Sequence, residues 1–321
     1  MELWIQIGAG LALLAVGVEA VVRGAVGAAR RLGVSELLIG LTLVGFGTSM
    51  PELLTSLSAA LRNSEGVAVG NVVGSNISNI LLIAALAAIA KPISVPRAAI
   101  VRDGVTMLAA TIALAAYAHF FPAVERWTGA LMLALLASYL WGTWLGERRS
   151  QGPSAELHRA GAQAYDPATP GLWLSLAFVV GGIVALGFGA DLLVQGAITL
   201  AQFAGVSDTV IGLTIVAVGT SLPELVATLA AAARGRSEVA FGNVVGSNIY
   251  NVLGVLGITA LVRPIAIPAD LGLIDWSVFV GAALLLMFHA ATGAGVSRRE
   301  GGILLAGYLL YVGHLATRVS L

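Results

Sequence analysis

The sequence has no cysteine and little charge, and each absence removes a class of protein. Without cysteine in 321 residues there is no disulfide framework, no thiolate metal site and no cysteine nucleophile. Charged residues are 11 % of the chain and the formal net charge is zero, so nothing indicates nucleic acid. Hydrophobic residues, in contrast, make up 58 % of the chain, and the mean hydropathy is strongly positive. The composition predicts a polytopic protein embedded in the lipid bilayer.

Ten apolar segments are near the length of about 20 residues that a helix needs to cross a bilayer. The predicted fold is therefore all-α, with ten transmembrane helices. Their expected positions are 4–22, 34–61, 67–90, 104–121, 128–145, 172–200, 206–233, 239–262, 271–291 and 301–319.

Basic residues indicate the orientation. Glu2 lies where a signal peptide would be basic, and the first positive cluster follows the first apolar run, so the N-terminus is expected outside. With that assignment thirteen Lys and Arg residues fall inside and four outside, as the positive-inside rule requires. We expect a multi-pass protein of the cell (plasma or inner) membrane with both termini extracytoplasmic. A cytoplasmic linker is expected at 146–170, and it is too short for a regulatory domain.

The chain repeats itself at a spacing of 172 residues. Residues 17–79 align without a gap to 189–251, with 34 identities in 63 positions. Each half carries five expected crossings, and this odd number makes the second half enter the membrane from the opposite side, as in the inverted repeats of many transporters. The predicted division is a first repeat at 1–145 and a second at 171–321.

Each half contains a proline and a glutamate in the middle of an apolar segment, in GTSMPE (47–52) and GTSLPE (219–224). Pro51 and Pro223 lack an amide hydrogen, so they free a carbonyl oxygen one turn earlier and break the helix. A free carbonyl is costly in lipid unless it lines a polar cavity. A single copy would be explained by a structural kink, but two copies that each carry a buried acid favour an ion site.

Glu52 and Glu224 are the expected centre of that site, since no Lys or Arg lies at the same depth to pair with them. Bound cations or protons are then their partners. A set of carboxylate, hydroxyl, amide and carbonyl oxygens suits a hard cation such as Ca²⁺, and it can also hold Na⁺. The further expected oxygen donors are Thr48, Ser49, Ser75, Asn79, Thr220, Ser221, Ser247 and Asn251.

The paired motifs resemble the two alpha repeats of the sodium/calcium exchanger family, prokaryotic type. The carrying stretches are GTSMPELLTS with GNVVGSNISN, and GTSLPELVAT with GNVVGSNIYN, within motifs at 45–79 and 217–251. The resemblance implies that Glu52 and Glu224 are central ligands, that the backbone oxygens of Gly45 and Ala217 contribute, and that the first and sixth helices slide to alternate access.

Asn79 and Asn251 set the charge of the expected site. Relatives often carry Asp at the second position, and potassium-dependent members also use an Asp in this motif, whereas both residues are Asn here. Two carboxylates neutralise one Ca²⁺ or two Na⁺, so exchange of more than two Na⁺ per Ca²⁺ would carry net charge. Potassium dependence is not favoured.

Other repeated residues have simpler interpretations. Gly74 and Gly246 are expected to weaken their helices, and Gly70, Gly74, Gly242 and Gly246 to allow close helix packing. Four asparagines are expected to be structural hydrogen-bonding groups more often than ligands: Asn71, Asn76, Asn243 and Asn248. Glu19 and Asp191 occupy matching positions, where they either guard an ion path or pair with polar neighbours.

Antiport of Na⁺ against Ca²⁺ is the favoured function, with H⁺/Ca²⁺ antiport as the nearest alternative. The Ser and Thr residues at both breaks favour Na⁺. An intramembrane hydrolase using Ser49 or Ser221 lacks a matching His or Lys base in both halves, and a passive cation channel would conduct without countertransport. We therefore expect no catalytic residue and no cofactor, only transported Na⁺ and Ca²⁺, and the sequence is compatible with a monomer.

Overall fold

The computed structural model of the chain describes residues 2–32, 45–94, 97–147, 171–293 and 295–318, and this part is mostly helical. By length and composition, seven described helices could cross a membrane, or eight if the bent pair Asp208–Thr220 and Leu222–Ala233 counts as one span. Helices occupy the described part of each of the ten expected segments. Residues 34–44 of the second segment and 148–170 of the expected linker lie outside the described residues.

The first half contains a long helix, a broken helix and a buried helix, followed by two further helices. Their bounds are α1 (Glu2–Arg31), α3 (Gly45–Thr48), α4 (Met50–Leu61), α5 (Glu65–Ser78), π-helical η2 (Asn79–Ala84), α6 (Ala85–Ala90), β1 (Ile93–Ser94), α7 (Arg97–Ala99), π-helical η3 (Ile100–Gly104), α8 (Val105–Phe120), β2 (Ala123–Val124) and α9 (Arg126–Glu147).

The second half follows the same order. Its elements are α11 (Leu172–Ala204), α12 (Asp208–Ile211), π-helical η4 (Gly212–Val216), α13 (Ala217–Thr220), α14 (Leu222–Ala233), α15 (Ser237–Ile249), π-helical η5 (Tyr250–Val255), α16 (Leu256–Val262), β3 (Ile265–Ala266), α17 (Leu273–Gly293), β4 (Gly295–Val296) and α18 (Arg298–Thr317).

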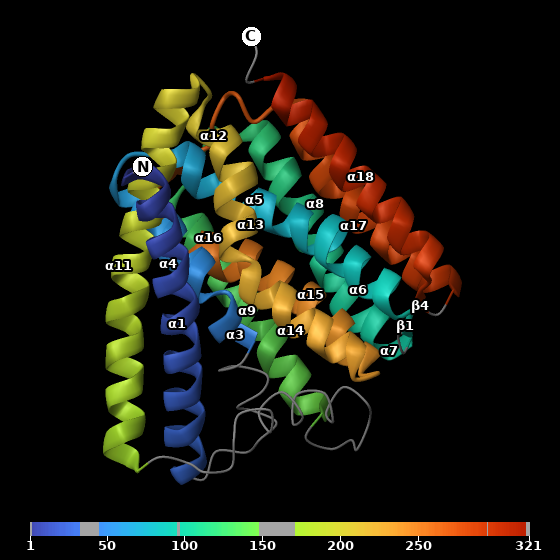
Figure 1. The fold of residues 1–321 in the computed structure, drawn as a ribbon. Helices are drawn as coiled ribbons and strands as arrows, with labels where there is room; N and C mark the ends of the chain where they lie inside the picture. Colours follow the sequence, from blue (N-terminus) through green and yellow to red (C-terminus); the bar gives the residue numbers. More distant parts are fainter. Residues whose placement is uncertain (1, 33–44, 95–96, 148–170, 294, 319–321) are drawn as a thin grey trace.

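Helices α1 and α11 form a long antiparallel pair at one side of the bundle (Figure 1). Glycines bring their backbones together: a Cβ at Gly10 would lie 2.8 Å from the backbone nitrogen of Leu193, and one at Gly182 would lie 2.7 Å from the carbonyl oxygen of Gly17. Such small residues let membrane helices pack closely. α1 begins, and α18 ends, at the end of the bundle opposite to the start of α11 (Figure 1).

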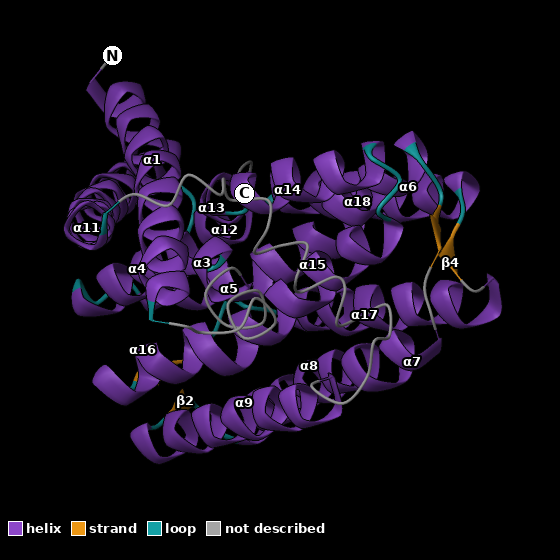
Figure 2. Ribbon diagram, turned by 90° about the horizontal axis from the view of Figure 1, so that it is seen from below, coloured by secondary structure: helices purple, strands orange, loops and turns teal. Residues whose placement is uncertain are grey.

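Two short ladders connect the halves at separate places, where β2 and β4 are labelled in Figure 2. β1 pairs antiparallel with β4, and β2 pairs antiparallel with β3. The Ile93–Val296 pair becomes the Val124–Ile265 pair when each residue is exchanged for its equivalent 172 positions away. The 172-residue relationship therefore extends beyond the aligned motifs into the connections between helices.

The helices α5 and α15 pass into wider π-helical segments a few residues after Gly74 and Gly246. α5 continues through Gly74, and the π-helical segment starts only at Asn79, with its counterpart starting at Tyr250. Neither Gly74 nor Gly246 interrupts its helix, since α5 and α15 continue through them. A Cβ at Gly74 would lie 2.7 Å from the carbonyl oxygen of Leu213, which confirms its packing role, whereas Gly246 has no such neighbour within 4 Å.

Candidate cation site

Both proline motifs interrupt a helix at the same residue type. Ser49 separates α3 from α4 with φ −86° and ψ 8°, and Ser221 separates α13 from α14 with φ −83° and ψ 8°. A ψ near zero departs from helical geometry and turns the chain. The helical segments Asp208–Thr220 and Leu222–Ala233, which meet at Ser221, are bent by 48° relative to each other. The sequence thus sets one local conformation twice, with Pro51 and Pro223 in the first turn of the helix that follows.

Glu52 lies at the start of α4 and is fully buried. Its Oε1 accepts a hydrogen bond of 2.9 Å from Ser221 Oγ, and Thr220 also bonds to its carboxylate. Its Oε2 has no hydrogen-bond partner among the residues that the structure describes. Glu52 therefore meets the break of the other half of the chain and keeps one oxygen available.

Glu224 has the equivalent surroundings at the start of α14, where it is 1 % exposed. Ser247 Oγ donates to its Oε1 at 3.4 Å, Thr48 bonds to its carboxylate, and no described residue bonds to its Oε2. The two glutamates are close enough for their charges to interact. Two buried carboxylates so arranged repel each other unless a cation or proton lies between them.

Hydroxyl and carbonyl oxygens extend the arrangement. Ser75 Oγ donates to the carbonyl oxygen of Ala217 at 3.3 Å and lies 3.5 Å from Thr220 Oγ1. Thr220 donates to Asn71 Oδ1 at 3.0 Å. The Ser49 hydroxyl is buried and has no partner within the described part of the chain. Gly45, the remaining expected backbone ligand, is the first residue of α3.

Four buried asparagines also join the two halves. Asn79 Nδ2 donates to Asn248 Oδ1 at 3.0 Å, and Asn251 Nδ2 donates to Asn76 Oδ1 at 3.1 Å. The Oδ1 atoms of Asn79 and Asn251 are buried without a partner. Their equivalent contacts follow the 172-residue relationship, and they leave two neutral acceptors free for a cation.

Asn71 and Asn243 have the structural role that was expected for them. Asn71 donates to Ser56 Oγ at 2.9 Å and to the carbonyl oxygen of Glu52 at 3.1 Å. Asn243 makes the equivalent bonds to Thr228 Oγ1 and to the carbonyl oxygen of Glu224. These contacts hold the first turn of α4 and of α14, and so they set the position of the glutamates.

The sequence analysis missed a second pair of buried acids outside the site. Tyr139 Oη donates to Asp103 Oδ1 at 3.0 Å, and Tyr311 Oη donates to Asp275 Oδ1 at 2.9 Å. Both Asp and both Tyr are 172 positions apart, so extending the repeat comparison past residue 251 would have found them. Asp275 is fully buried and also pairs with Arg318.

The arrangement can bind hard cations. Its free atoms are carboxylate, hydroxyl and amide oxygens, which Ca²⁺ and Na⁺ prefer. Among the described residues no group of three or more His, Cys, Asp or Glu could hold a metal ion. A cation here would therefore rely on the two glutamates and on neutral oxygens.

Comparison with known proteins gives a consistent result over nearly the whole chain. The family described as "Sodium/calcium exchanger protein" matches residues 2–145 and 174–316. The chain is similar to the putative antiporter CaxA of Alkalimonas amylolytica, with 37 % identity over 94 % of this chain and 95 % of that protein. It is also 33 % identical to the sodium/calcium exchanger MaX1 of Methanosarcina acetivorans, over 94 % of this chain and 95 % of the relative.

A solved structure extends the similarity to three dimensions. The sodium-calcium exchanger NCX_Mj, soaked with 2.5 mM Na⁺ and 0.1 mM Ca²⁺, superimposes with a TM-score of 0.65 at 32 % identity and covers 98 % of both chains. The family expected from the paired motifs is confirmed. The chain belongs to the sodium/calcium exchanger family, and it is a multi-pass membrane exchanger of cations against Ca²⁺.

Proposed function

We propose that the protein is a secondary antiporter that exchanges Na⁺ for Ca²⁺ by alternating access at a site around Glu52 and Glu224. One observation carries the proposal: each buried carboxylate bonds to the break in the other half and keeps one oxygen without a partner. Such groups are costly inside a membrane protein unless a cation completes them.

The proposed ligands are the expected set. Glu52 and Glu224 supply charge, and neutral oxygens supply the remaining coordination. These neutral donors are Thr48, Ser49, Ser75, Asn79, Thr220, Ser221, Ser247, Asn251 and the carbonyl oxygens of Gly45 and Ala217. Support comes from the buried, unpartnered oxygens of Ser49, Asn79 and Asn251.

We propose ten crossings arranged as two inverted five-helix repeats, 1–145 and 171–321, with both termini extracytoplasmic and the protein in the plasma or inner membrane. The exchanged equivalents in the two ladders and the matching breaks support the repeat. The excess of basic residues at one set of loops supports the orientation. An inverted repeat gives one site two access routes of opposite direction.

Charge neutrality explains the coupling. With two carboxylates, one Ca²⁺ or two Na⁺ leave the site neutral, and the two ions compete for the same oxygens. An empty site keeps two buried negative charges, so its passage through a closed state is costly. Exchange of more than two Na⁺ per Ca²⁺ moves net positive charge with Na⁺, which makes the cycle electrogenic.

Ion-driven uptake into proteoliposomes tests the proposal. An outward Na⁺ gradient should drive ⁴⁵Ca²⁺ uptake, and an inside-positive potential set by K⁺ and valinomycin should speed this Ca²⁺ entry, because net positive charge then leaves with Na⁺. A pH gradient alone should give no uptake. If a pH gradient drives uptake and a Na⁺ gradient does not, the protein is an H⁺/Ca²⁺ antiporter. An electroneutral cycle would show no dependence on potential.

A further inference from the structure

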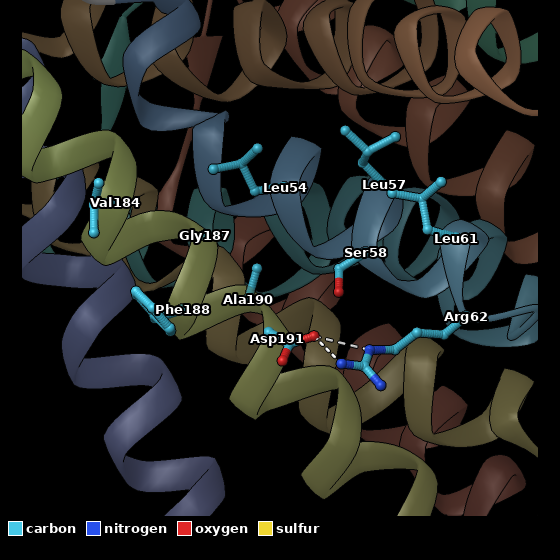
Figure 3. A pocket seen from close by; sticks show the side chains of 10 residues that line it. All are labelled: Leu54, Leu57, Ser58, Leu61, Arg62, Val184, Gly187, Phe188, Ala190 and Asp191. Carbon is cyan, nitrogen blue, oxygen red and sulfur yellow. Dashed lines mark hydrogen bonds and ion pairs between the residues drawn. The ribbon is translucent and has the colours of Figure 1, made fainter.

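An ion pair joins α4 to α11 at the surface of the bundle. The Nε of Arg62, the residue that follows α4, donates to Asp191 Oδ1 at 2.9 Å, and its Nη2 contacts the same oxygen (Figure 3). Gln195 donates to Asp191 Oδ2 at 2.7 Å. The side chains of Arg62 and Asp191 are 38 % and 42 % exposed, so water reaches the pair.

The pair spans a groove of about 580 Å³ between the two helices. Leu54, Leu57 and Ser58 of α4 line one wall, and Val184 and Phe188 of α11 line the other (Figure 3). α4 also carries Glu52 in its first turn. The groove therefore lies along the helix that bears one of the two central carboxylates.

The equivalent residues in the other half are not paired in this structure. Glu19 and Arg234 stand 172 positions from Asp191 and Arg62. Glu19 pairs instead with Arg23 on its own helix, and Arg234 is exposed without an ion pair among the described residues. The two halves thus have the same charged residues but only one of the two interhelical ion pairs.

Helix packing shows the same asymmetry. α11 packs along α4, whereas α1 makes no comparable contact with α14 in the described part of the chain. Val226 of α14 is 67 % exposed, while Leu54, its equivalent on α4, is half-buried against α11. Helices α4 and α11 are therefore packed together, whereas their equivalents α14 and α1 are apart.

We propose that Arg62–Asp191 and Arg234–Glu19 are alternating latches, each formed in one access state and broken in the other. Inverted repeats exchange their conformations when access changes sides, so the contact made by one half must pass to its equivalent. The structure holds the Arg62–Asp191 latch. The inference rests on the alternating access proposed above.

The sequence makes the two latches unequal. Arg23 neutralises Glu19 locally, whereas the equivalent neighbour of Asp191 is the uncharged Gln195. Arg234 must therefore compete with Arg23 for Glu19, and Arg62 has no cationic competitor on α11. This difference favours the state with the Arg62–Asp191 latch, which is the state seen here.

Labelling of introduced cysteines measures which latch is formed, because the chain has no cysteine of its own. Ser58→Cys reports on the groove between α4 and α11, and Ala230→Cys is its equivalent on α14. Each is made separately and treated with a membrane-impermeant maleimide on either face of sealed vesicles. Asp191→Asn should speed labelling of Ser58→Cys and slow that of Ala230→Cys, by about two- to five-fold for a water-exposed pair. Glu19→Gln removes the other latch, so it should slow labelling of Ser58→Cys and speed that of Ala230→Cys.

Two further variants separate a latch from ordinary packing. Arg23→Gln frees Glu19 for Arg234, so it should slow labelling of Ala230→Cys and speed that of Ser58→Cys. The exchanged pair Arg62→Asp with Asp191→Arg should restore the labelling rates of the unaltered latch. A merely structural ion pair would give no reciprocal change at the cysteine on the other side.

The outcomes distinguish this inference from the proposed function. If Na⁺ drives ⁴⁵Ca²⁺ uptake but Asp191→Asn and Arg23→Gln leave both labelling rates unchanged, or move both cysteines in the same direction, the latches do not exist and exchange stands. If uptake fails and labelling of both cysteines is insensitive to Na⁺ and Ca²⁺, alternating access itself is wrong. Reciprocal shifts with intact uptake support both.

Discussion

Ser221 Oγ donates a hydrogen bond to Glu52 Oε1 at 2.9 Å, although 169 residues separate them in the chain. The helix break of the second half thereby completes the surroundings of the carboxylate in the first half. In the same way, Thr48 beside the break of the first half bonds to Glu224 of the second half. Neither half contains a whole site, so both carboxylates must contribute if a cation binds between them.

We predict that Glu52→Gln and Glu224→Gln each reduce Na⁺-driven ⁴⁵Ca²⁺ uptake. Each substitution removes half of the formal negative charge and leaves a bound Ca²⁺ with only one buried carboxylate to balance it, which corresponds to a loss of about 100-fold or more. Uptake into proteoliposomes at low Ca²⁺ measures the effect. Glu65→Gln, a partly buried acid at the start of α5, serves as the control and should transport normally. Normal transport by either site variant would contradict the ligand assignment.

Asn251→Asp should make stability depend on cations. Asn251 Nδ2 donates to Asn76 Oδ1, and an ionised Asp cannot donate, so two oxygens would face each other in a buried place. We expect a lower apparent Tm in buffer without Na⁺ and Ca²⁺, by several degrees for a cost of about 1–3 kcal/mol. Added Ca²⁺ should recover the loss, because a third carboxylate strengthens cation binding.

Asn251→Leu is the matched comparison for that experiment. It removes the same hydrogen bond but adds no charge, so its lower Tm should gain nothing extra from Ca²⁺. A Ca²⁺ response that is equal in the Asp and Leu variants would show that residue 251 lies away from the cation. Thermal unfolding in detergent, with and without Ca²⁺, provides the measurement.

Tyr311→Phe should destabilise the protein more than Tyr139→Phe. Asp275 is fully buried, so loss of the Tyr311 hydroxyl leaves an oxygen without a replacement from water, at a cost of about 1–3 kcal/mol. Asp103 is 8 % exposed, and its Oδ1 keeps a 2.6 Å bond from Arg102 Nε when the Tyr139 hydroxyl is lost, whereas Arg318 bonds to Oδ2 of Asp275 and leaves its Oδ1 unreplaced. Apparent Tm values check the order. Tyr308→Phe is the control, since the Tyr308 hydroxyl has no hydrogen bond among the described residues, and equal losses for all three would refute the argument.

The sequence was sufficient for the elements that depend on local chemistry. Apolar length marked the helices, and the proline after GTS marked both breaks, because a missing amide hydrogen acts within one turn. Spacing also identified the family and the repeated acids Glu52 and Glu224. These features require no knowledge of which residues touch across the bundle.

Contacts between the halves could not be predicted in the same way. The bonds from Ser221 to Glu52 and from Asn79 to Asn248 depend on how two helices cross, which one-dimensional spacing does not contain. It is still harder to predict from the sequence that Arg62 forms an interhelical ion pair and Arg234 does not. The two arginines occupy equivalent positions, and although Arg23 beside Glu19 favours pairing of Arg62, the pair that forms also depends on the conformation of the chain.

The Glu300 side chain gives the protein an acid-sensitive contact at the start of α18, before the expected span 301–319. Its Oε2 accepts a 2.7 Å hydrogen bond from the Ser297 backbone nitrogen, and its Oε1 lies 3.2 Å from His289 Nδ1. The bond from the Ser297 backbone, followed by that from its hydroxyl and the charge of His289, holds the pKa of Glu300 below its usual value.

This lowered pKa predicts the direction of a pH effect. A carboxylate whose pKa is lower in the folded state stabilises the fold above its unfolded pKa of about 4.3, and the contribution disappears as pH falls through the folded pKa. Glu300→Gln should therefore have a lower apparent Tm at pH 7 and a smaller fall in Tm between about pH 5 and pH 3 than the unaltered protein. Glu65→Gln should keep the unaltered slope. A Glu300→Gln protein whose Tm falls as steeply below pH 5 would show that the bonds to Ser297 and His289 do not contribute to acid sensitivity.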